Sequence, residues 1–154
     1  PTSILLMLLM FIGGAPISAA GGIKVTSLVL TLLFIKSTLK NEQHPSIFKK
    51  SIHDHTLKTA VAITFSAGTF VIFISFIVSY LNSTISYSKV LFEVISAFGT
   101  VGLSMNFTTV YDSPTKIVIV LTMLIGKIGI LTFLQLFITE KKQKFYYAKE
   151  NVHL

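Results

Sequence analysis

Long apolar segments, separated by short polar ones, dominate this chain. Residues 60–81 contain no charged side chain, and a helix of that length, rising about 1.5 Å per residue, crosses the hydrocarbon core of a bilayer. Residues 117–138 form an equally long segment with one charge, Lys127, near the middle. The pattern therefore predicts two long apolar helices that cross a membrane.

Two shorter apolar runs, residues 4–12 and 89–98, rise only about 15 Å as helices, which is roughly half of the hydrocarbon core. Each is followed by a glycine-containing stretch, residues 13–24 and 99–103. A half-length helix must turn inside the membrane, where irregular backbone is tolerated only if protein or a water-filled path covers it. The alternative is that these glycines are ordinary helix ends and surface loops.

The two halves of the chain have the same order of segments: a short apolar helix, a glycine-containing turn and an apolar helix such as residues 25–35. Residues 18–21 align with residues 99–102, and each tetrapeptide ends in glycine. Repeats of helix, pore loop and helix build pores with axial pseudo-symmetry. Two copies do not surround an ion path, so we expect about two more copies upstream.

Composition supports an all-α membrane protein. Hydrophobic residues make up 52% of the 154 residues, charged residues only 12%, and the mean hydropathy is +0.76. The net charge of +7 comes from 13 lysines against 6 acids. These lysines flank apolar runs and form no patch with interleaved aromatics, which argues against nucleic-acid binding. Most lie in residues 36–58 and 139–154, so the positive-inside rule makes both segments cytoplasmic.

The tripeptide Thr100-Val101-Gly102 resembles the core of a potassium-channel selectivity filter, in which backbone carbonyls replace the hydration shell of the ion. The same three residues also suit a tight turn between buried helices, since glycine is the default residue for irregular backbone. The sequence contains no phosphate loop and no nucleophile–base motif, so we do not expect an enzyme.

Three motifs resemble one family, the Trk/Ktr/HKT potassium transporters. Residues 10–24 (MFIGGAPISAAGGIK) resemble its third pore loop, and residues 92–108 (FEVISAFGTVGLSMNFT) its fourth. Residues 122–133 (TMLIGKIGILTF) are similar to the closing helix of the bacterial Ktr membrane subunit, where an arginine commonly stands in place of Lys127. The resemblance implies the C-terminal part of a membrane subunit roughly three times as long.

On this resemblance the chain has four parts. Residues 1–40 hold the third pore helix, its filter loop and the following helix. Residues 41–58 are a basic cytoplasmic loop. Residues 59–139 are a complete fourth helix–pore loop–helix repeat, and residues 140–154 are a basic cytoplasmic tail.

The resemblance also implies the residues of a potassium filter, contributed by both loops. They are Ala19, Ala20, Gly21, Thr100, Val101 and Gly102. The family usually has threonine at the position of Ala19 and glycine at that of Ile17, which affects the packing of the third loop. A gate after the third loop would fall in residues 34–48, where Pro45 is the strong helix breaker.

Partners and substrate are likewise implied by the resemblance. Potassium is the expected substrate, with possible dependence on sodium and no covalent cofactor. The expected assembly is a homodimer of multi-pass subunits in the cell membrane, on a cytoplasmic ring of nucleotide-binding RCK-type regulatory subunits. The basic tail is placed to contact that ring or anionic lipid.

Two charges inside apolar segments need an explanation, because a lysine at the bilayer centre costs about 2.5–3.5 kcal/mol on insertion scales. Lys127 is predicted to lie below the filter and limit occupancy by cations, although a lysine on a tilted helix can also extend to the interface. Glu93, in the fourth pore helix, is predicted to anchor the filter or neutralise positive charge, with Lys127 as a candidate partner.

Two alternatives to potassium uptake stay open at this stage. One is a sodium-preferring member of the same family, because two of the four loops that determine selectivity are not in this sequence. The other is a membrane scaffold whose glycine turns serve only helix packing.

Overall fold

The computed structural model describes residues 2–15, 18, 20–40, 46–47, 50–106 and 111–135. The elements, in chain order, are α1 (Thr2–Phe11), α2 (Val25–Leu39), β1 (Ser46–Ile47), β2 (Lys50–Ser51), α3 (Asp54–Leu81), α4 (Tyr87–Gly99), α5 (Ser113–Ile128) and α6 (Ile130–Gln135). The strands form one short antiparallel pair with Ser46 opposite Ser51, inside the predicted basic loop. The predicted all-α class is confirmed.

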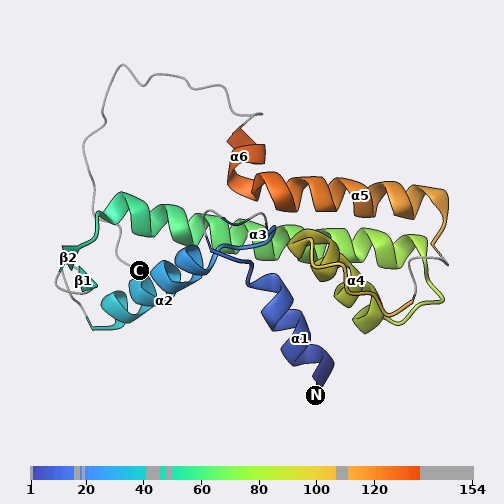
Figure 1. Ribbon diagram of the computed structural model, residues 1–154, viewed down its shortest axis with the longest axis horizontal. Helices are drawn as coiled ribbons and strands as arrows, with labels where there is room; N and C mark the ends of the chain where they lie inside the picture. The colour runs from blue at the N-terminus through green and yellow to red at the C-terminus, as the bar shows by residue number, and fades with distance from the viewer. Residues whose placement is uncertain are drawn as a thin grey trace, which may run out of the picture.

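Helix α3 is the element against which most others pack. It has 28 residues and is about 42 Å long at 1.5 Å per residue. Of the helices that the structure describes, it is the one long and apolar enough to cross a membrane. Helices α2, α4, α5 and α6 all contact it (Figure 1). The helix predicted for residues 60–81 is confirmed and begins earlier, at Asp54.

Helices α1 and α4 are short, with 10 and 13 residues, as their apolar runs predict. Both end beside the middle of α3 (Figure 1), and the ring of Phe98 near the end of α4 lies 6.0 Å from Phe70 of α3 and 6.1 Å from Phe11 of α1. Ser86 precedes α4, but its hydroxyl pairs with that of Ser88 at 3.3 Å and does not cap the helix.

Helix α4 forms the centre of the core, since every residue from Phe92 to Gly99 is buried. By contrast, α3 and α5 expose large apolar side chains, including Phe65 (75% exposed) and Ile117 (61% exposed). Apolar surface of this extent marks contact with lipid or protein. Together with the composition, it identifies an all-α membrane protein.

The helix predicted for residues 117–138 is wrong in its bounds. Helix α5 begins at Ser113, with a proline in its first turn, and ends at Ile128. Gly129 then adopts a φ of 94°, which favours glycine, and α6 starts in a new direction (Figure 1). Hydropathy does not register this break because glycine interrupts no apolar run. Lys127 consequently lies in the last turn of α5, and residues 136–138 are outside the described part.

Candidate functional site

The end of α4 turns the chain back by a left-handed cap at Thr100. The Thr100 N–H donates to the carbonyl of Ala97 at 3.1 Å, and the Val101 N–H to that of Ser96 at 3.0 Å, which is the bonding of a Schellman motif. Thr100 has a φ of 52°. A β-branched residue is unusual in this conformation, which costs on the order of 1–3 kcal/mol.

Side chains of α4 hold the segment that leaves this turn. The Ser96 hydroxyl donates to the carbonyl of Leu103 at 2.5 Å. The Glu93 carboxylate accepts two bonds of 2.7 Å, from the Ser104 hydroxyl and the Met105 N–H. Glu93 is only 5% exposed, so these bonds offset part of the cost of burying its charge. They fix the outgoing backbone beside the helix, and that Glu93 thereby anchors a filter stays a prediction.

The loop after α1 is closed by backbone hydrogen bonds between its two ends. The Gly13 N–H donates to the carbonyl of Ile23 at 2.7 Å, and the Ile23 N–H to that of Phe11 at 3.3 Å. A Cβ at Gly13 would collide with the carbonyl oxygen of Gly21, so glycine permits this close approach. The ends of a long loop are therefore held together at the end of α1.

The two loops meet at Gly21 and Thr100, which are 79 residues apart in the sequence. The Gly21 N–H donates to Oγ1 of Thr100 at 3.0 Å. Gly21 is buried, and a Cβ there would lie 2.9 Å from the carbonyl oxygen of Phe98. Gly99 lies just as closely against the backbone of Met10. The ends of α1 and α4 are thus in direct main-chain contact.

A third segment, the last part of α5, completes this arrangement. The Gly126 carbonyl accepts a bond of 3.3 Å from the Gly22 N–H. Gly126 also packs against the backbone of Phe98, whose side chain is 1% exposed. Both loops and α5 therefore converge on the end of α4.

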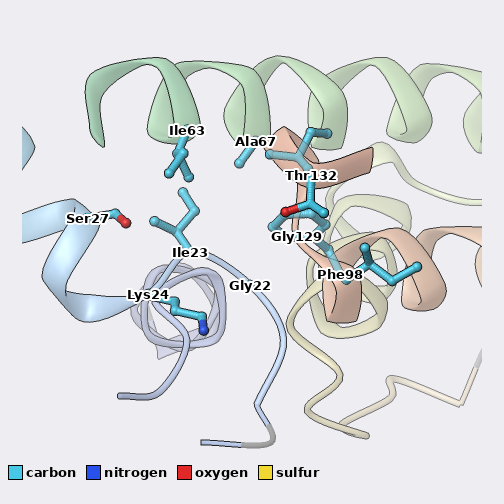
Figure 2. Close-up of a pocket in the computed structure, with 11 residues that line it drawn as sticks. Gly22, Ile23, Lys24, Ser27, Ile63, Ala67, Phe98, Gly129 and Thr132 are labelled. Carbon is cyan, nitrogen blue, oxygen red and sulfur yellow. The ribbon is translucent and has the colours of Figure 1, made fainter. Parts of the chain in front are cut away.

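A cavity of about 180 Å³ lies next to this meeting point (Figure 2). It is surrounded by the end of the loop after α1, the start of α2, the middle of α3, the end of α4 and the α5–α6 break. Its lining residues are Gly22, Ile23, Lys24, Ser27, Ile63, Ala67, Phe98, Ile128, Gly129, Ile130 and Thr132. The C-terminal ends of α1 and α4 carry the negative ends of their helix dipoles, which favour a cation in this region.

The predicted filter residues fall in different surroundings, and their filter role stays a prediction. Gly21 is buried against Thr100, whereas Ala20, Val101 and Gly102 are exposed. Ala19 lies outside the described residues, as do Ile17, Pro45, most of residues 41–49 and the tail. Helix α2 continues without interruption to Leu39 and ends there, and the gate predicted for residues 34–48 stays a prediction.

The two loops, which align in sequence, are built differently. Gly102 follows the end of α4 by three residues, whereas Gly21 follows the end of α1 by ten. The positive φ of Gly102, 82°, is matched at Gly22 rather than at Gly21. The resemblance between the loops therefore does not extend to their local conformation.

Lys127 is exposed in the last turn of α5 and does not line the cavity. The Glu93 carboxylate bonds Ser104 and Met105, and among the described residues no ion pair joins it to Lys127. The candidate pairing of these charges is not found. Sequence reasoning also missed Ser96, which shares a helix face with Glu93 three residues earlier and could have been found by that spacing.

Taken together, these features define an α-helical membrane protein whose two half-length helices end in loops joined by the Gly21–Thr100 hydrogen bond. Comparison with known proteins specifies it further. Residues 1–149 match the TrkH family model, described as a cation transport protein. The chain belongs to this family.

Several curated relatives match nearly the whole chain. Ktr system potassium uptake protein D of Bacillus subtilis is 38% identical over 145 residues, covering 94% of this chain and 32% of the relative. Ktr system potassium uptake protein B of Vibrio alginolyticus is 30% identical over 152 residues, covering 99% and 33%. The potassium/sodium uptake protein NtpJ of Enterococcus hirae is 35% identical over 132 residues, covering 84% and 29%. The chain spans about a third of the length of these relatives.

Proposed function

We propose that this chain is part of the ion-conducting membrane subunit of a potassium uptake system, in which potassium passes through a filter of backbone carbonyls down its electrochemical gradient. One observation carries the proposal: α1 and α4 end together beside the middle of α3, and their loops are joined by the Gly21–Thr100 hydrogen bond (Figure 1). Irregular backbone in such a position suits a path for a desolvated ion. The Ktr relatives are named as potassium uptake proteins, which supports the same substrate.

The proposal assigns the complete path to a longer protein, because the relatives are about three times the length of this chain. Two further repeats would supply the other sides of the pore. We also propose, on family resemblance, a homodimer in the cell membrane with a cytoplasmic C-terminus, bound to an RCK-type regulatory ring, and no enzymatic step. We expect no potassium-selective flux from the 154-residue chain alone in liposomes.

Growth of a potassium-uptake-deficient bacterium at limiting potassium tests the proposal. The full-length protein should restore growth, and Gly102→Ser or Gly102→Asp should abolish it, because a φ of 82° disfavours a side chain. Gly68→Ser is the matched control, since Gly68 of α3 has open space around it. Equal growth with Gly102→Asp and the control, at equal expression, would instead favour a membrane scaffold.

Sodium preference is the second candidate, because NtpJ is named for both potassium and sodium. Uptake of rubidium, as a potassium tracer, and of sodium into vesicles separates the two. Potassium selectivity predicts that excess sodium does not compete with rubidium. Competition at equal concentrations would assign the chain to a sodium-preferring transporter. Rubidium uptake with and without sodium shows whether sodium is required.

A further inference from the structure

The Thr100 side chain packs on the neighbouring loop through both of its branches. Oγ1 and Cγ2 each lie 3.0 Å from the position that a Cβ on Gly21 would occupy. Oγ1 also accepts the Gly21 N–H at 3.0 Å. The hydroxyl is therefore held by the loop after α1, which is the predicted third pore loop. One of the two lone pairs of Oγ1 is already used in this bond.

The backbone conformation of this turn does not itself require threonine at position 100. Gly99 and Gly102 flank Thr100, so the turn already uses glycine, and a glycine would also adopt the φ of 52° without strain. What threonine adds at this position is an acceptor for the buried N–H of Gly21. Such an N–H needs a partner at membrane depth, where water does not supply one.

We propose that the Thr100 hydroxyl is a positioning group that fixes the spacing between the third and fourth loops, and thereby determines cation selectivity, without binding the permeating ion itself. This inference rests on the proposed function, because the spacing affects selectivity only if both loops line a cation path. It makes Thr100 a positioning residue whose target is Gly21.

A set of variants in the full-length protein separates this role from general packing. Thr100→Val keeps the shape and removes the acceptor, while Thr100→Ser keeps the acceptor. Thr122→Val is the control: Thr122 is fully buried in α5, and its hydroxyl bonds Val118 of its own helix. We expect Thr100→Val to lower the potassium-to-sodium uptake ratio on the order of tenfold, because the two loops lose the bond that sets their spacing, and the serine variant to retain the ratio. Equal ratios for the valine and serine variants would overturn the proposal.

Replacing the Gly21 amide by an ester, through incorporation of glycolic acid, removes the donor and leaves Thr100 untouched. The same loss of selectivity is expected, with little further loss when Thr100→Val is added, because both changes break one bond. If the ester retains selectivity while Thr100→Val loses it, the hydroxyl serves the ion directly and the proposal is wrong. The ester variant also tests the proposed role of the Thr100 hydroxyl if Thr100→Val fails to fold.

Hydrogen exchange of the peptide that contains Gly21 provides a measurement independent of transport. In the purified full-length protein, Thr100→Val should speed exchange there, and Thr100→Ser should not. Unchanged exchange in the valine variant would refute the hydrogen bond. If the wild type takes up no potassium, the proposed function fails, and the exchange result still establishes whether Thr100 positions Gly21.

Discussion

Gly126 of α5 lies against the backbone carbonyl of Phe98 so closely that no side chain fits between them. A Cβ at Gly126 would fall 2.8 Å from the carbonyl carbon of Phe98 and 3.0 Å from its Cα. Because these are backbone atoms, they cannot move aside as the end of a flexible side chain does. The contact therefore fixes how closely α5 approaches the end of α4.

Gly126→Ala is expected to destabilise the full-length protein by about 1–3 kcal/mol, the usual effect of overpacking a well-packed core. It should also displace α5 and weaken the Gly22–Gly126 hydrogen bond. Thermal unfolding in detergent measures the change. Gly68→Ala, at a helical glycine with open space, should be neutral or stabilising. Equal thermal unfolding midpoints for Gly126→Ala and Gly68→Ala would contradict the close approach of Gly126 to Phe98.

Glu93 variants test the anchoring of the outgoing loop. Both donors bond the same carboxylate oxygen, and glutamine retains one acceptor there. Glu93→Gln should cost about 1 kcal/mol, because the bonds lose their charge assistance, while Glu93→Ala should cost about 2–4 kcal/mol by leaving buried donors unpaired. Unfolding midpoints and the potassium-to-sodium uptake ratio report the result. Unchanged folding and selectivity in Glu93→Gln would exclude a role for its charge.

Tyr111, between α4 and α5, has a buried hydroxyl with no hydrogen-bond partner among the residues that the structure describes. Burial, and secondarily the negative charge of Glu93, raise the pKa of Tyr111 from 10.0 to about 12. The unfolded chain releases this proton at lower pH than the folded one, so stability should fall as pH rises from about 10 and level off above about 12. Unfolding midpoints measured from about pH 9 to about pH 12 test this loss of stability.

Tyr111→Phe should remove this alkaline contribution. At neutral pH it should leave stability unchanged or raise it by up to about 1 kcal/mol, because the hydroxyl is buried and has no partner in the described part of the chain. Tyr80→Phe, at a position 87% exposed, is the control. A large loss of stability at neutral pH in Tyr111→Phe would show that the hydroxyl has a partner in the full-length protein.

Asn82 links the end of α3 to the start of α5. Its side-chain N–H groups donate to the Thr115 hydroxyl at 2.7 Å and to the Val78 carbonyl at 3.1 Å, and Thr115 is fully buried. Asn82→Ala and Thr115→Val should show a coupling of about 0.5–2 kcal/mol in a double-mutant cycle. Additive effects on the unfolding midpoint would mean that the two helices are held together by other contacts.

Most of the helices could be predicted because their signals are local. A run of apolar residues places each of α1, α2, α3 and α4 along the chain, although α2 and α3 extend past the bounding lysines Lys36 and Lys58. The half-length of α1 and α4 follows from counting. The basic loop and the glycine turns can be predicted for the same reason, because each is a local run of lysines or glycines. Three short motifs in a fixed order indicate the family.

Features that depend on contacts between distant segments could not be predicted. The break at Gly129 lies inside an apolar run, and one glycine does not reveal whether a helix bends or continues. The Gly21–Thr100 bond joins positions 79 residues apart, and the sequence predicts a role for the carbonyl of Thr100 but gives no sign of this bond to its hydroxyl. Glu93 was recognised as unusual, but its bonds to Ser104 and Met105 depend on the turn at Thr100.

Residues 92–99 of α4 are buried on all sides, which affects the order of assembly. A helix of 13 residues is too short to be held in a bilayer by itself, and its core positions contact α1, α3 and α5. It therefore reaches its final surroundings only after α5 has been synthesised and has turned back beside α3. The meeting of the two loops is thus expected to be among the last events in folding, completed by a helix that follows both loops in the sequence.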